Sequence, residues 1–273
     1  MVWEVGGRGP HSHPHSTLIG GAHFFPRHFR RSLRALIGEA RMVLLEGPLD
    51  EAARRKVLEA GRGSGGGALY EAAKDRIHAR LGILPAPLDV HQLLKDVLFG
   101  RQEQWLEEEL RSLKPWAAFF GVWTRFRERQ GWTHSVDVDA ARIATELGRE
   151  IGYLETIDEQ IALLEAVPLE RFARFLARED WSAYCAAYER HYLAGELDAL
   201  VTAAQAFPTY CEPIIGRRDG VLAERMEGEL ERGGACVVIG VAHCPGVLAA
   251  LRARGFEVYP YGSPPLALPR KMR

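Results

Sequence analysis

The 273-residue sequence lacks most of the short motifs that assign a function on sight. Its four cysteines are scattered, with no CxxC pair, so neither a zinc knuckle nor a disulfide scaffold is indicated. There is no HExxH and no GxSxG sequence, so the commonest zinc-protease and serine-hydrolase sites are not supported. The glycine-rich run at 61–67 lacks the GK[ST] ending of a phosphate-binding loop.

The chain also lacks a strong net charge and a long apolar run. The formal net charge is −1, which argues against nucleic acid or an anionic membrane as a partner. No apolar run approaches the ~20 residues that span a bilayer, and no secretory leader follows Met1. We therefore expect a cytoplasmic protein with no membrane span, and the oligomeric state stays open.

What the sequence does have is a strand-rich region at each end and helices between them. Apolar and β-branched runs bounded by Gly and Pro predict strands at 2–5, 16–22, 41–47, 150–156, 235–242 and 256–261. The helix predicted at 245–255 makes the last two strands a βαβ unit. We expect one α/β domain over 1–273 with a mixed, mostly parallel sheet. The sheet core comes from about 1–60, 150–156 and 234–262, and a large helical insertion occupies about 68–226.

Four histidines near the start, His11, His13, His15 and His23, raise the question of which one does chemistry. The first three lie in a Gly/Pro-rich stretch with the composition of a hairpin loop, so a solvent-exposed loop is expected there. His23 ends the sequence IGGAH, and the same Gly-x-x-His pattern recurs in IGVAH, which ends at His243.

The repeated pattern places each imidazole just beyond the C-terminal end of a predicted strand. In open parallel sheets this edge is where ligands bind. Glu46 follows a third strand in the same way. Together His23, Glu46 and His243 predict a site that suits a divalent transition metal, or general acid–base chemistry without one.

The quoted motifs resemble those of the TraB/GumN family, which includes the Tiki metalloproteases and is distantly similar to erythromycin-esterase and ChaN-like proteins. The resemblance rests on GGAH (20–23), LLEG (44–47) and GVAHCPG (240–246), and it covers almost the whole chain. Further segments in the family's order are KPW (114–116), SVDVDAARIATELGREIGYLET (135–156), YLAGELDAL (192–200) and RRDGVLAERM (217–226).

This resemblance implies an enzyme, a hydrolase with peptidase-like activity on a peptide or small-molecule substrate. It implies that His23, His243 and Glu46 bind a divalent metal such as Mn²⁺, Co²⁺ or Zn²⁺, which would activate a water molecule. Arg218 would stabilise developing negative charge, and Glu155 would join the same edge. Two alternatives stay open: a metal-independent esterase with a histidine as general base, and a non-catalytic protein that binds a ligand or haem.

Three further positions bear on the site. Asp137 corresponds to the Asp ahead of the family's central helix, and we expect it to be that helix's N-cap. Asp219 stands where relatives often have Asn, and Cys244 stands where an apolar residue is more usual. We expect Cys244 to be a small buried filler.

Overall fold

The structure, a computed structural model, describes residues 1–7, 15–81 and 101–262, and its centre is a six-stranded sheet. The strands are β1 (Val2–Gly6), β2 (Ser16–Gly21), β3 (Met42–Leu45), β4 (Glu150–Tyr153), β5 (Ala235–Gly240) and β6 (Glu257–Pro260). Their order is β4-β3-β5-β2-β1-β6. All neighbours from β4 to β2 are parallel, and β1 is antiparallel to both β2 and β6. The predicted α/β fold with a mixed, mostly parallel sheet is confirmed.

Burial explains why the central strands read as continuous apolar runs. Every residue of β5 is buried, and so is every residue of β3. Parallel strands covered on both faces have no solvent side, so apolar residues fill all positions rather than alternate ones. β1 and β2 are paired antiparallel, and the loop predicted between them lies mostly outside the described residues. His15 is exposed at its end, whereas His11 and His13 lie outside the described residues.

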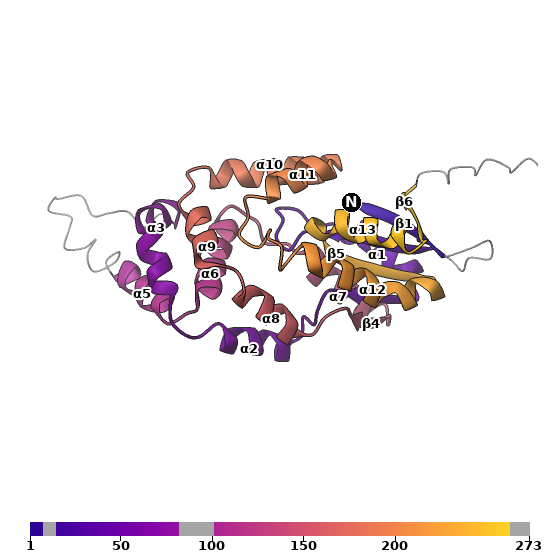
Figure 1. Ribbon diagram of the computed structural model, residues 1–273, viewed down its shortest axis with the longest axis horizontal. Helices are drawn as coiled ribbons and strands as arrows, with labels where there is room; N and C mark the ends of the chain where they lie inside the picture. Colours follow the sequence, from indigo (N-terminus) through magenta and orange to yellow (C-terminus); the bar gives the residue numbers. More distant parts are fainter. Residues whose placement is uncertain (8–14, 82–100, 263–273) are drawn as a thin grey trace, which may run out of the picture.

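Helices cover the two faces of the sheet (Figure 1). α1 (Arg30–Glu39) packs against α7 (Val136–Glu146), which contacts β3 and β4. On the other face α12 (Gly216–Arg232) packs against α13 (Cys244–Ala253), and α12 also contacts β5. The β5–α13–β6 unit is parallel as predicted, but β2 and β1 lie between its two strands. Two helices of the predicted insertion, α7 and α12, thus belong to the sheet layers.

The remaining helices extend from the carboxyl ends of the parallel strands as a separate layer (Figure 1). They are α2 (Glu51–Ala60), α3 (Gly66–Leu81), α5 (Arg101–Arg111), α6 (Pro115–Arg129), α8 (Ile157–Glu165), α9 (Leu169–Leu176), α10 (Trp181–Ala194) and α11 (Leu197–Ala204). Trp123, Phe175 and Trp181 are fully buried in this layer, with Trp123–Phe175 ring centres 5.0 Å apart. Within the described residues no helix is both long and apolar enough to cross a bilayer.

Candidate functional site

The carboxyl ends of four neighbouring parallel strands bring the predicted site residues together. Because the order is β4-β3-β5-β2, the strand ends present Glu155, Glu46, Gly240 and His23 in that order along one edge. Two backbone bonds continue the β3–β4 ladder past the strands, and the second runs from the Glu155 N–H to the Glu46 carbonyl (2.7 Å). His243 follows β5 by one turn of 3-10 helix, η2 (Val241–His243).

Arg218, near the start of α12, links the polar side chains of this edge. Its Nε and Nη2 donate to the two oxygens of Glu155 at 2.7 and 2.6 Å, and Nη2 also donates to Glu46 Oε2 at 2.9 Å. Its Nη1 lies 2.8 Å from Nε2 of His243. The side chains of Arg218 and Glu46 are each 10% exposed, and that of Glu155 is 4% exposed. Two carboxylates and one guanidinium thus form a buried ion network.

Each histidine of the site is held by its own aspartate. Nδ1 of His23 lies 2.7 Å from Asp137 Oδ2, and Nδ1 of His243 lies 2.7 Å from Asp219 Oδ1. A carboxylate at Nδ1 selects the tautomer that carries its proton there, which fixes the ring and directs Nε2 away from the aspartate. The Nε2 atom of His243 therefore accepts from Arg218, and the Nε2 atom of His23 faces the cavity described below.

Gly21, beside the first Gly-x-x-His histidine, and Gly246, three residues after the second, make room for these aspartates. A Cβ at Gly21 would lie 2.9 Å from Asp137 Oδ1, and a Cβ at Gly246 would lie 1.9 Å from Asp219 Oδ2. Any larger residue would push the carboxylate away from its histidine. Gly21 and Gly246 thus help to build the two Asp–His pairs.

The charges of the network keep Glu46 ionised. Burial alone raises the pKa of Glu46, but its electrostatic interactions with His243 and Arg218 outweigh it. The charge of His23 and the backbone N–H of Gly240 act in the same direction, so the pKa falls to about 2. Glu46 is therefore a fixed anion at neutral pH and a weak proton acceptor.

His23 is shifted in the opposite direction. The negative charge of Asp137 is the largest cause, and it raises the pKa of His23 to about 9 against a smaller opposing effect of burial. The charge of Glu46 also raises it, while that of Arg218 lowers it. The side chain of His23 is 62% exposed, and it borders a cavity.

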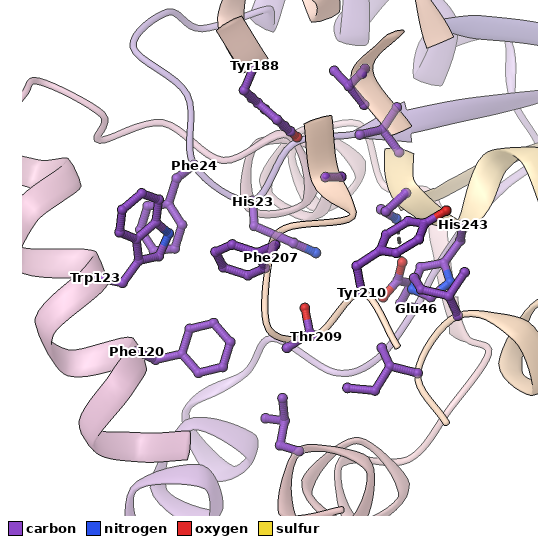
Figure 2. Close-up of a pocket in the computed structure, with 18 of the residues that line it drawn as sticks. His23, Phe24, Glu46, Phe120, Trp123, Tyr188, Phe207, Thr209, Tyr210 and His243 are labelled. Atoms are coloured by element: carbon purple, nitrogen blue, oxygen red, sulfur yellow. Dashed lines mark hydrogen bonds between the residues drawn. The ribbon is translucent and has the colours of Figure 1, made fainter. Parts of the chain in front are cut away.

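A cavity of about 400 Å³ opens from this edge toward the helical layer. Figure 2 shows Glu46 and His243 on one side of it, Trp123, Phe24 and Phe120 on the other, and His23 between them. Apart from the polar groups at the sheet edge the wall is mainly apolar and aromatic. Its size and composition are those of a small-molecule site.

The structure thus brings together all five predicted site residues: His23, Glu46, Glu155, Arg218 and His243. The pairing of the two histidines with Asp137 and Asp219 was not predicted from the sequence. The prediction that Asp137 is an N-cap is wrong, because Ser135 caps α7 through a bond from the Val138 N–H, and Asp137 turns to His23 instead. Cys244 is fully buried against the position of Gly20, as expected of a filler.

The metal that the resemblance implies does not fit these side chains as they lie. Arg218 engages Nε2 of His243 and Oε2 of Glu46, and the Gly240 N–H engages Oε1 of Glu46. A raised pKa keeps His23 protonated at neutral pH, and a protonated imidazole is no ligand. Across 1–7, 15–81 and 101–262 no group of three His, Cys, Asp or Glu side chains is arranged to hold a metal ion. A Mn²⁺, Co²⁺ or Zn²⁺ cofactor stays a prediction.

Replacing Asp137 tests the electrostatic description of His23. In Asp137→Asn the pKa of His23 is expected to fall from about 9 toward 6.5, because the largest raising charge is lost. The measurement is an NMR pH titration of the imidazole Cε1–H, assigned from the signal absent in His23→Gln. Asp139→Asn, on the same helix and paired with Arg142, is the control and should leave the titration unchanged.

The same shift has a consequence for stability. The pKa of His23 is about 9 in the folded protein and 6.5 in the unfolded chain. The Asp137–His23 pair therefore stabilises the protein fully below pH 6.5, and this contribution is lost as pH rises through about 9. The unfolding free energy of the wild type should therefore exceed that of Asp137→Asn by more at pH 6 than at pH 10. Equal differences at the two pH values, or an unmoved His23 titration, would contradict the assigned pair.

Gly240 keeps the space between the site residues open. A Cβ there would lie 3.1 Å from Glu46 Oε1 and 3.3 Å from His23 Nε2, while the φ of −56° suits alanine. Gly240→Ala is therefore expected to abolish ligand binding or turnover while costing only about 1–3 kcal/mol of stability through overpacking. Ligand titration and urea unfolding measure the two effects. Gly38→Ala, where a Cβ meets nothing within 4 Å, is the control and should behave as the wild type. Wild-type ligand binding and turnover in Gly240→Ala would contradict the role given to Gly240.

Comparison with known proteins adds the family. Neither a curated protein nor a solved structure matches the chain. The TraB/PrgY/gumN family matches it over residues 1–260, a range that includes every site residue described above. The match confirms the resemblance indicated by the two Gly-x-x-His motifs, and the chain belongs to the TraB/PrgY/gumN family.

Proposed function

We propose that this protein is a hydrolase that cleaves an amide or ester bond of an apolar substrate, with His23 as the proton carrier. The observation that carries this proposal is the Asp137–His23 pair, whose free Nε2 faces the cavity beside Glu46. A carboxylate, an oriented imidazole and a substrate-sized cavity are the parts of a general-base site.

The other titratable groups of the cavity are poorer candidates for this role. Glu46 has a pKa of about 2. Burial raises the pKa of Cys185 to about 11 and raises that of Tyr188 still further. His243 already accepts a hydrogen bond from Arg218 at Nε2. His23 is left as the group that can exchange a proton with water near neutral to mildly alkaline pH.

The proposed reaction needs only groups present at this edge. Nε2 of neutral His23 takes a proton from a water molecule, whose oxygen forms a bond to the substrate carbonyl carbon. As the tetrahedral intermediate collapses, the bond to the leaving nitrogen or oxygen breaks and His23 returns the proton to it. Asp137 stabilises the imidazolium in between.

Arg218 supports the negative charge that develops on the carbonyl oxygen. A guanidinium has five N–H donors, and the bonds to Glu155, Glu46 and His243 use four of Arg218's within the described part of the chain. The remaining N–H is on Nη1, and Arg218 lines the cavity. A donor fixed by two carboxylates needs little reorganisation when the charge forms.

The metal-independent form of the proposal has the better support. Arg218 already supplies a positive charge to Glu46 and His243, where the metal-dependent form would place the ion. The metal-dependent form keeps one supporting observation: both histidines are held at Nδ1 by carboxylates, as metal-bound histidines usually are. Metal analysis separates the two forms, as set out at the end of the Discussion.

The pH dependence of turnover tests the role of His23. The substrates are p-nitrophenyl esters and p-nitroanilides of apolar acids of increasing length. Because the base must be unprotonated, kcat/KM should rise about tenfold per pH unit from pH 6.5 and level off near pH 9. In Asp137→Asn the plateau should begin at lower pH.

A flat or falling profile would contradict the base role. If no compound is turned over while apolar ligands still bind in the cavity, the non-catalytic ligand-binding alternative is favoured instead. In that case His23→Gln and Gly240→Ala should still change the binding.

A further inference from the structure

The proposed hydrolysis leaves one charged group of the cavity without a role. Arg127, in the last turn of α6, lines the cavity together with Trp123 and Phe24. Figure 2 shows Trp123 and Phe24 across the cavity from Glu46 and His243. The cavity therefore has a cation at its aromatic wall as well as the ion network at the sheet edge.

Aromatic rings, rather than carboxylates, surround this guanidinium. Its Cζ lies 4.2 Å from the ring centre of Trp132, 5.4 Å from that of Phe24 and 5.5 Å from that of Trp123. Nη2 donates to the Phe24 carbonyl at 2.7 Å, while Nε is buried with no hydrogen-bond partner. No Asp or Glu of the described residues forms an ion pair with it. Burial lowers the pKa of Arg127, because keeping a charge out of water is unfavourable.

Arg218 has carboxylate partners, whereas Arg127 has none among the described residues. Arg218 is equally part of the cavity wall, but it is neutralised by Glu46 and Glu155. The ring faces around Arg127 stabilise a cation, yet apart from the Phe24 carbonyl at Nη2 the described residues offer its in-plane N–H groups no acceptor. Nε is buried, so Nη1 and the second N–H of Nη2 are left to pair with a carboxylate, which accepts two parallel hydrogen bonds from a guanidinium that lines a cavity.

We propose that Arg127 binds the carboxylate of an otherwise apolar ligand held in the cavity. Resting on the proposed function, this makes the substrate an apolar ester or amide that also carries a free carboxylate, with its scissile bond toward His23. The mainly apolar wall between the two ends takes the uncharged body of the molecule.

Binding of 4-phenylbutyrate and its neutral amide, measured by calorimetry at pH 7.5, tests this assignment. The two compounds share one apolar body, so their difference reports the charge. The wild type is expected to bind the acid at least about tenfold more tightly than the amide. Arg127→Met should lose this preference, with the affinity for the amide unchanged. Arg125→Met, two residues earlier and paired with Glu109 at 2.7 Å, should behave as the wild type.

The alternative is a purely structural role, because Arg127 also holds the Phe24 carbonyl next to His23. In that case Arg127→Met would weaken the acid and the amide equally, and the proposal would be wrong. Equal binding of both compounds by the wild type, or binding of neither, would also overturn it. His23→Gln should keep the preference for the acid, so carboxylate binding is judged separately from hydrolysis.

Discussion

His23→Gln is expected to lower kcat/KM by about 10²- to 10⁴-fold on the p-nitrophenyl ester or anilide that the protein cleaves fastest. Glutamine keeps a polar group of similar reach but cannot exchange a proton near neutral pH. Because the side chain of His23 is 62% exposed to the cavity, its replacement removes no core packing. The measurement is steady-state kinetics on protein whose folding has been checked by circular dichroism.

The matched control for this variant is His191→Gln. His191 also forms a histidine–carboxylate pair, with Nδ1 2.6 Å from Glu196 Oε2, but it does not line the cavity. It should keep wild-type kcat/KM. If His23→Gln retained activity within about threefold of the wild type, His23 would not carry the proton and the mechanism proposed here would fail.

Arg218→Ala is expected to lower the free energy of unfolding by about 3–5 kcal/mol. The change leaves Glu46 and Glu155 buried without their cation, and uncompensated buried charge is far more costly than a lost surface contact. Urea unfolding at pH 7.5 measures the effect. The control is Arg225→Ala on the same helix, whose guanidinium pairs with Glu159 in an exposed position and should cost less than about 1 kcal/mol.

A compensating variant sharpens this test. If the cost arises from unpaired carboxylates, Arg218→Met combined with Glu46→Gln and Glu155→Gln should recover a large part of the lost stability. A single Arg218→Ala variant as stable as Arg225→Ala would contradict the ion network. A triple variant that is less stable than Arg218→Met alone would also contradict the ion network.

Much of the site was predictable because its residues follow strands that the sequence makes visible. A strand buried on both faces reads as an apolar run, and β5 is the clearest case. His23, Glu46 and His243 each come just after such a run, and parallel strands end at one edge. Sequence position was therefore enough to bring them together, although not to say what they contact.

The second layer of the site was not predictable from local patterns. Asp137 lies 114 residues from His23, and its own surroundings resemble a helix start, where Ser135 proved the stronger capping residue. Asp219 is adjacent to Arg218 in sequence, yet only the fold shows that the two side chains contact opposite nitrogens of the same ring, that of His243. The aromatic residues of the helix that holds Arg127 are typical of an ordinary core. Only the folded cavity reveals a cation that no Asp or Glu of the described residues pairs with.

The most direct test of the central claim is the response of untagged protein to metal. The account predicts no bound Mn²⁺, Co²⁺ or Zn²⁺ by elemental analysis after purification. It also predicts that Glu46→Gln and His243→Gln leave any metal-induced change in melting temperature unaltered, because both side chains are hydrogen-bonded to Arg218 and do not bind the metal. A bound metal, or a rise of several degrees with added metal that both substitutions abolish, would contradict it and favour the metal-dependent hydrolase.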